Sequence, residues 1–105
     1  MLRGSVPMER KLWENTTIEE IIDEVTRISR KYGVKHLFLF GSYARGTATK
    51  YSDIDFVIQG ITNKNDYLNE IDNIRTIKKI DIVDYDVCRN ENLKKDVDSY
   101  ARKIY

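Results

Sequence analysis

The chain has 105 residues, of which 41% are hydrophobic, with one Pro, five Gly and one Cys. This size and composition predict one compact globular domain and exclude a catalytic domain joined to a separate substrate-binding domain. The sequence contains 18 Lys and Arg residues and 17 Asp and Glu residues, so its net charge is near neutral. This argues against direct binding of nucleic acid or of an anionic membrane surface.

No apolar run approaches the ~18–20 residues of a membrane span, and the first residues lack the apolar stretch of a signal peptide. We therefore expect a cytoplasmic protein with no membrane partner. Cys88 is the single Cys, so an internal disulfide cannot form and His36 has no zinc-binding pattern around it. A domain of this size buries only about two-thirds of the surface of its unfolded chain, so a remaining apolar face could be covered by another protein.

A single domain is expected to span residues 16–105, preceded by an N-terminal extension of residues 1–15. Residues 1–7 match no periodic pattern. They are set aside as an added segment or an alternative start upstream of Met8.

The first predicted element is a helix of about four turns. Thr16 and Thr17 with Glu19 and Glu20 form a capping box at its start, and Gly33 supplies the C-terminal stop. Its apolar face consists of residues at helical spacing: Ile18, Ile21, Ile22, Val25, Ile28 and Tyr32.

Three segments rich in strand-forming residues follow, at 34–40, 53–58 and 80–85. The first two carry apolar residues on both faces, as expected of strands buried inside a domain. A helix starting near Asp66 separates the second segment from the third, and a last helix starts at Asn90 or Asn92. The apolar stripes of these helices are Leu68, Ile71, Ile74 and Ile77 in the first, and Leu93, Val97, Tyr100 and Ile104 in the last.

The lengths of the connections predict the directions of the strands. Only a short irregular loop joins the first strand to the second, so these strands are expected to be antiparallel neighbours. About twenty residues with a helix join the second strand to the third, which predicts a parallel pair. The expected fold is α/β (α+β), a small mixed three-stranded sheet flanked by helices in the order α-β-(short α)-β-α-β-α.

This topology brings a set of polar residues to one edge of the sheet. Gly41-Ser42 ends the first strand, Asp53 and Asp55 start the second, and Asp81 starts the third. Residues two apart on a strand point from one face about 6.5 Å apart, close enough to serve a metal pair. Oxygen ligands without His or Cys suit magnesium better than zinc. Gly41 would let the backbone approach a phosphate and Ser42 would offer a hydroxyl, so the pattern predicts a site for a nucleoside triphosphate and its metal ions.

The same residue types also occur at positions without a metal site. Asp-x-Asp at a strand start is often a solvated edge or a turn, and the nearby Gly-Ser is what favours a metal site. Asp84 and Asp86 compete with Asp81 for the third acidic position, but strand parity puts them on the opposite face, where surface acids are expected. Asp81 is chosen as the base that takes the proton of the attacking hydroxyl. Arg45 could neutralise phosphate charge or form a simple surface ion pair.

Three segments together resemble the signature of the minimal nucleotidyltransferases of the DNA polymerase β-like superfamily: 40–46, 52–58 and 79–83. The similarity extends from about Thr16 to the C-terminus. It implies that Gly41 and Ser42 contact the triphosphate, as nucleotide-binding residues together with Arg45. It also implies that Asp53, Asp55 and Asp81 are catalytic and bind two Mg²⁺ ions.

Many minimal members of that family are antitoxins that neutralise a HEPN-domain toxin by transferring AMP from ATP onto one of its tyrosines. The resemblance therefore implies a Mg²⁺-dependent protein adenylyltransferase with ATP as substrate, in a hetero-oligomer with such a toxin. Two alternatives stay open at this point. The chain could be a non-catalytic module that blocks a partner by contact, or a nucleotidyltransferase for a small hydroxylated molecule.

Overall fold

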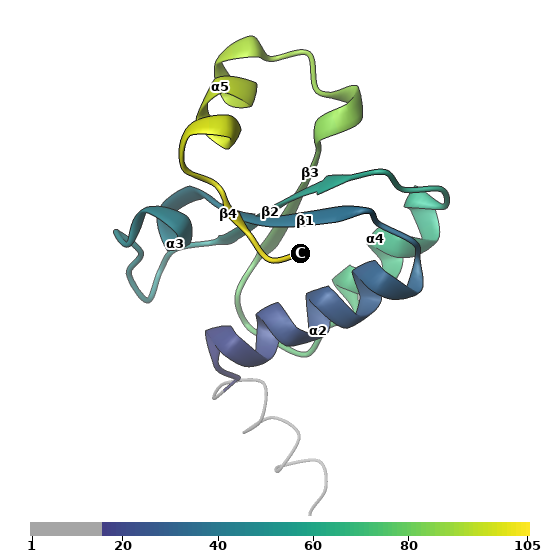
Figure 1. The fold of residues 1–105 in the computed structure, drawn as a ribbon. Helices are drawn as coiled ribbons and strands as arrows, with labels where there is room; N and C mark the ends of the chain where they lie inside the picture. The colour runs from purple at the N-terminus through teal and green to yellow at the C-terminus, as the bar shows by residue number, and fades with distance from the viewer. Residues whose placement is uncertain (1–15) are drawn as a thin grey trace, which may run out of the picture.

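The computed structural model describes residues 16–105, so the predicted N-terminal extension lies outside the described residues. In Figure 1, α2 (Ile18–Lys31) and α4 (Lys64–Asp72) lie on one side of the strands and α5 (Glu91–Tyr100) lies on the other. The elements in chain order are α2 (Ile18–Lys31), β1 (His36–Phe40), α3 (Gly41–Arg45), β2 (Ile54–Gln59), α4 (Lys64–Asp72), β3 (Ile80–Asp84), the 3₁₀ turn η1 (Tyr85–Val87), α5 (Glu91–Tyr100) and β4 (Arg102–Lys103). Within this described part, no helix is both long and apolar enough to cross a membrane.

The strands form one mixed sheet in the order β3-β2-β1-β4. β1 pairs antiparallel with β2, with Phe40 opposite Asp55. β2 pairs parallel with β3, with Asp55 opposite Asp81. The predicted fold class and both predicted strand directions are therefore confirmed.

The C-terminal segment differs from the prediction. α5 ends at Tyr100, and Arg102–Lys103 form a fourth strand paired antiparallel with Phe38 and Leu39 of β1. Ile104, which was expected on the last helix, instead follows this strand and packs against the core. Two exposed basic residues on a sheet edge have no alternation of polar and apolar side chains, so nothing in the sequence indicated a strand there.

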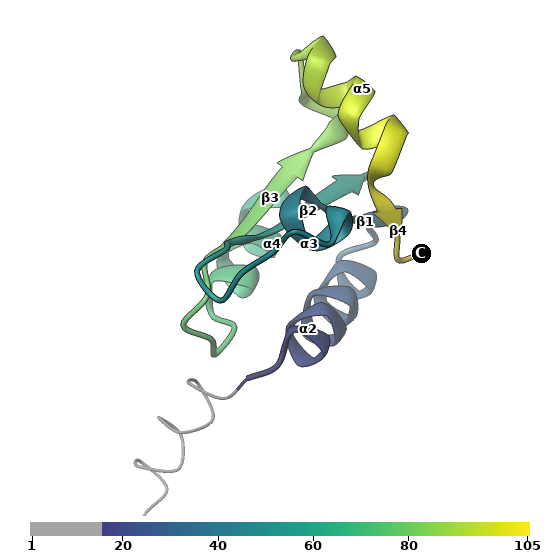
Figure 2. The ribbon, with the colours of Figure 1, turned by 90° about the vertical axis from the view of Figure 1, so that its left-hand side faces the viewer.

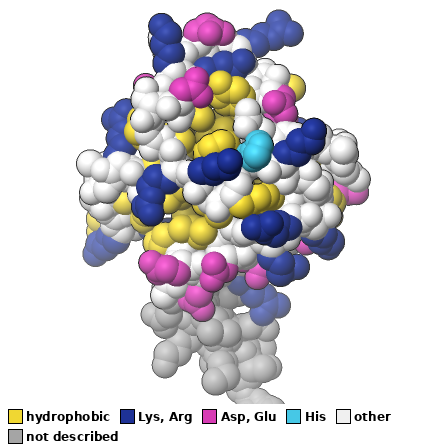
Figure 3. All heavy atoms as spheres, viewed as in Figure 1, with side chains coloured by type: hydrophobic (Ala, Val, Ile, Leu, Met, Phe, Trp, Pro, Cys, Tyr) yellow, Lys and Arg dark blue, Asp and Glu magenta, His cyan; other side chains and the backbone are white. Residues whose placement is uncertain are grey.

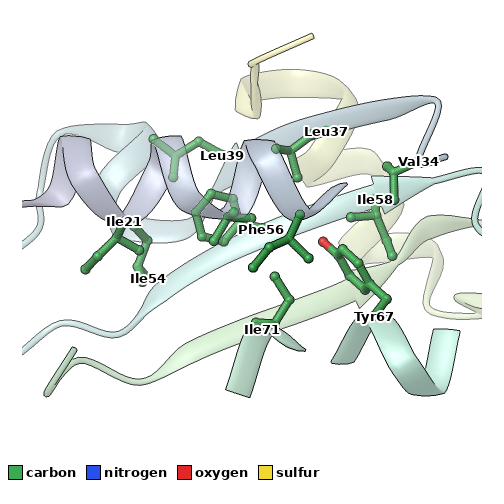
Figure 4. Close-up of a cluster of buried hydrophobic side chains, with 11 residues drawn as sticks. Ile21, Val34, Leu37, Leu39, Ile54, Phe56, Ile58, Tyr67 and Ile71 are labelled. Atoms are coloured by element: carbon green, nitrogen blue, oxygen red, sulfur yellow. The ribbon is translucent and has the colours of Figure 1, made fainter. Parts of the chain in front are cut away.

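The main hydrophobic core lies between the sheet and the helices α2 and α4 (Figure 4). α2 begins at the predicted capping box, in which Thr17 and Glu20 satisfy each other's backbone N–H groups. One buried polar contact joins the two helices, a hydrogen bond of 2.9 Å between the hydroxyl groups of Ser29 and Tyr67. The buried core residues are Ile21, Val25, Ile28, Val34, Leu37, Leu39, Ile54, Phe56, Ile58, Tyr67 and Ile71.

α4 is shorter than its predicted apolar stripe. It ends at Asp72, and Tyr67 and Ile71 are its buried residues. Ile77, predicted on the stripe, is 71% exposed in the connection to β3. The spacing of isoleucines continued past the end of the helix, so periodicity alone overestimated its length.

The two faces of the sheet carry different kinds of side chain near the predicted site. Leu37, Leu39 and Phe56 point into the core against α2 and α4. Because side chains alternate along a strand, Phe40 and Asp55 point to the other face, over which α5 passes (Figures 1 and 2). The acidic residues therefore lie on the face away from the main core.

Candidate active site

Two of the predicted acidic residues are direct neighbours across parallel strands. Asp55 on β2 lies opposite Asp81 on β3, and Asp53 stands just before β2. Partial burial raises the pKa of Asp55 to about 6, and the negative charges of Asp81 and Asp53 add to this effect. A carboxyl group placed this way favours a proton or a cation beside it.

Gly41 lies directly against Asp55. Its φ of +67° is left-handed, a conformation that side chains rarely adopt. A Cβ at this position would collide with the Oδ2 atom of Asp55. Only glycine lets the turn between β1 and α3 come this close to the carboxylate. Ser42, the next residue of α3, is half-buried beside it.

The side chain of Lys78 links the loop before β2 to the connection between α4 and β3. Its Nζ donates hydrogen bonds to the carbonyl oxygens of Lys50 (3.0 Å) and Ser52 (3.3 Å). The loop that carries Asp53 is thereby attached to the connection between α4 and β3. A groove of about 790 Å³ opens between these loops, and its lining includes Tyr43, Lys50, Tyr51, Asp53, Ile77, Lys78 and Lys79. Neither Lys78 nor this groove was predicted from the sequence.

The competing acids have structural partners on other parts of the molecule. Asp84 forms an ion pair of 3.3 Å with Lys64, and its side chain is only 6% exposed. The expectation that it is a surface acid was therefore wrong, because the start of α4 covers it. Asp86 accepts a hydrogen bond of 2.7 Å from the backbone N–H of Gly60.

Arg45 lies at the end of α3, where its guanidinium group is 4.1 Å from the ring centroid of Tyr100. It is exposed, and it is not one of the residues in ion pairs with carboxylates within the described residues. On the face of the molecule seen in Figure 3, Lys and Arg side chains are dispersed among hydrophobic ones and form no continuous basic stripe.

The chemistry of the donors suits magnesium, since the three acids offer carboxylate oxygens only. Among residues 16–105, however, no three His, Cys, Asp or Glu side chains already stand close enough together to hold a metal ion. Asp55 and Asp81 form the closest part of the predicted set, and Asp53 lies at its margin, exposed at the start of β2. Mg²⁺ is often held by one or two carboxylates together with the phosphates of a substrate, so this arrangement fits the ion.

Comparison with known proteins decides the family. The sequence model of the family described as Nucleotidyltransferase domain matches residues 18–104. The chain belongs to this family. As a nucleotidyltransferase it is similar to two proteins of Methanocaldococcus jannaschii. The one named "Putative protein adenylyltransferase MJ1379" is 35% identical over 88 residues, which cover 77% of this chain and 88% of the relative. The one named "Putative protein adenylyltransferase MJ0128" is 32% identical over 94 residues, covering 78% and 92%.

Solved structures share the fold of this nucleotidyltransferase at low sequence identity. A crystal structure described as a toxin-antitoxin with AMP-PNP gives a TM-score of 0.60 at 20% identity, covering 79% of this chain and 71% of that one. A toxin-antitoxin MntA-HpeT variant with a tyrosine replaced by alanine gives a TM-score of 0.64 at 20% identity, covering 80% and 71%. At this identity the likeness concerns the fold alone.

Proposed function

We propose that this nucleotidyltransferase transfers AMP from ATP to a hydroxyl group of a partner protein, in a reaction that depends on Mg²⁺. The acceptor that we propose is a tyrosine of a HEPN-type toxin, which the transfer neutralises, so the chain acts as an antitoxin in the cytoplasm. The observation that carries the proposal is the Asp55–Asp81 pair on parallel strands, with Gly41 packed against Asp55.

The comparisons support this choice of nucleotide and acceptor. The two relatives from Methanocaldococcus jannaschii are named as protein adenylyltransferases. The structural neighbours are described as toxin-antitoxin proteins, one of them with AMP-PNP.

The reaction is an in-line displacement at the α-phosphorus of ATP. The acceptor oxygen forms a bond to this phosphorus, and the bond from the phosphorus to the oxygen that bridges to the β-phosphate breaks, so pyrophosphate leaves. In the proposal the carboxylate of Asp81 takes the hydroxyl proton. Gly41 and Ser42 hold the triphosphate, with Arg45 offering its guanidinium group to the phosphate oxygens.

Asp53, Asp55 and Asp81 would hold Mg²⁺ together with the phosphates. When bound, the ions would stabilise the charge on the attacking and leaving oxygens. The raised pKa of Asp55 supports this role, because three carboxylates that repel one another gain from a cation placed among them.

The direct test is incubation of the purified protein with labelled ATP, Mg²⁺ and the product of the neighbouring gene, followed by mass spectrometry. The proposal expects a mass increase of one or more AMP units on a partner tyrosine. Asp53→Asn with Asp55→Asn should abolish the label, while Asp23→Asn on the exposed side of α2 should leave it unchanged. A folded partner that stays unlabelled would overturn the proposed acceptor.

The same variants separate the two alternatives. A module that acts by contact alone would neutralise the partner equally well with Asp53→Asn and Asp55→Asn. A transferase for a small hydroxylated molecule would leave the partner unlabelled and would label an aminoglycoside offered in its place.

A further inference from the structure

Tyr100 contacts residues at both ends of α3, the short helix that begins with Gly41-Ser42. Its ring stacks on that of Phe40, the residue before Gly41, with the centroids 5.2 Å apart and the planes at 15°. The guanidinium group of Arg45, four residues after Gly41, lies 4.1 Å from the centroid of the same ring. Stacked rings and a cation over a ring at these distances attract each other.

The backbone fixes the position of Tyr100. It is the last residue of α5, and two residues later Arg102 pairs with Leu39 of β1. One turn before it, Val97 is buried. Phe40 is equally constrained, since it ends β1 and caps α3. The ring therefore connects the C-terminal helix to the turn without depending on a flexible segment.

Arg45 needs such support if it is to act on a substrate. Its side chain is exposed, and among the described residues its guanidinium group is not in an ion pair with a carboxylate. A free arginine side chain loses rotamer entropy when a ligand fixes it, and this loss weakens binding. A guanidinium group that lies over the face of a ring still has N–H groups that can donate to phosphate oxygens.

We propose that Tyr100 is a positioning residue that holds Arg45 beside the Gly41-Ser42 turn for the phosphates of the nucleotide. This inference rests on the proposed function, because it takes the turn to be the triphosphate site. Tyr100 acts through Arg45, and its hydroxyl group is not required. The aromatic ring at the end of α5 therefore adds to nucleotide affinity through Arg45.

The test measures the Kd of AMP-PNP with Mg²⁺ by titration calorimetry, which needs no acceptor. Tyr100→Leu is expected to weaken binding about three- to ten-fold, the range of a lost cation–π contact. Tyr100→Phe, which keeps the ring, should stay within about two-fold of the wild type. In an Arg45→Ala background, Tyr100→Leu should cause no further loss, because the residue through which it acts is gone.

A matched control comes from the other end of the molecule. The guanidinium group of Arg30 lies 4.0 Å from the centroid of the Tyr105 ring, and Arg30→Ala should leave the Kd unchanged. Thermal unfolding checks that each variant folds. Should Tyr100→Leu fail to fold, Arg45→Lys carries the test, since it keeps the charge but loses the planar group and should weaken binding as Tyr100→Leu would.

Two results would overturn the inference. One is wild-type affinity in Tyr100→Leu, or in Arg45→Lys where that variant carries the test. The other is an equal weakening by Tyr100→Leu with and without Arg45, which would mean that the ring acts by another route. In either case the proposed function stands, because the wild type still binds the nucleotide. Failure of the wild type to bind AMP-PNP with Mg²⁺ would overturn both proposals.

Discussion

At the scale of single residues, Gly41 combines a left-handed backbone with a close approach to the Asp55 carboxylate. Gly41→Ala would place a methyl group against the Asp55 carboxylate and strain a left-handed backbone. We expect it to abolish AMP transfer and to lower the free energy of unfolding by about 1–2 kcal/mol. Labelled-ATP assays and urea unfolding measure the two effects.

Gly33→Ala is the matched control for this prediction. Gly33 also has a positive φ, of +75°, but a Cβ there would meet nothing within 4 Å. It should show a similar loss of stability with full transferase activity. If both variants lost activity equally, backbone strain rather than the contact with Asp55 would explain the result.

The raised pKa of Asp55 leads to a second prediction, which concerns how the stability of the protein without divalent ions depends on pH. Its pKa of about 6 lies above the ordinary value of 3.8. At pH values between these two, the folded state therefore holds a proton that the unfolded state releases. The stability that this group contributes is complete below about pH 4 and is lost as the pH rises through about 6.

Asp55→Asn should therefore be more stable than the wild type at pH 8 in EDTA, and the difference should shrink towards pH 4. Urea unfolding at pH 4, 6 and 8 measures it, with Asp23→Asn as the control. A stability difference that is the same at all three pH values would show that the ionisation of Asp55 is not its cause.

At the scale of the elements, Lys78 attaches the loop that carries Asp53 to the connection before β3. Lys78→Met keeps the length of the side chain but removes its hydrogen bonds to the carbonyl oxygens of Lys50 and Ser52. We expect about a ten-fold loss of AMP transfer, because even a small misplacement of catalytic groups is costly. The melting temperature should change little, since these bonds lie near the surface.

Lys79→Met is the control for Lys78→Met, because Lys79 is more exposed and only approaches Asp81 at 3.7 Å. It should reduce transfer less than Lys78→Met. Equal losses in the two variants would indicate that the positive charge of the groove matters rather than the attachment of the loop.

The elements also show how far the sequence could predict this molecule. α2, the three longer strands and their directions were predicted because capping residues, apolar patterns and loop lengths are local signals. β4 was not, since Arg102 and Lys103 become a strand only by pairing with β1. The end of α4 was misjudged because Ile74 and Ile77 continue its spacing beyond Asp72.

The candidate site also contains residues that the sequence predicted and residues that it did not. Gly41, Ser42, Asp53, Asp55 and Asp81 were predicted because they fall at strand ends that the topology brings to one edge; their chemical roles remain predictions. Lys78 and Tyr100 were not singled out as site residues. Their contacts with the site join segments far apart in the chain, and no pattern along the sequence encodes such a contact.

At the scale of the whole molecule, ligand binding should be visible as added stability. A ligand at about 100 times its Kd adds about 2.7 kcal/mol to the free energy of unfolding. For a domain of this size, 1 kcal/mol corresponds to roughly 4–8 °C in melting temperature. AMP-PNP with Mg²⁺ at that level should therefore raise the melting temperature by at least about 10 °C.

EDTA should abolish most of this increase, and Asp53→Asn with Asp55→Asn should show little of it. Differential scanning fluorimetry measures the melting temperature under each of these conditions. A full increase in the presence of EDTA would mean that the nucleotide binds without the help of a divalent ion.

The sheet carries the main hydrophobic core on one face and the proposed site on the other. Leu37, Leu39 and Phe56 face α2 and α4, while Asp55 and Phe40 face the opposite side. That opposite side also buries Val57 and Val97, so mutational drift at its exposed positions can alter what the enzyme recognises at little risk to its folding. A small scaffold of this kind could thus acquire new acceptors over evolutionary time, or in a laboratory selection, while its interior sequence stays unchanged.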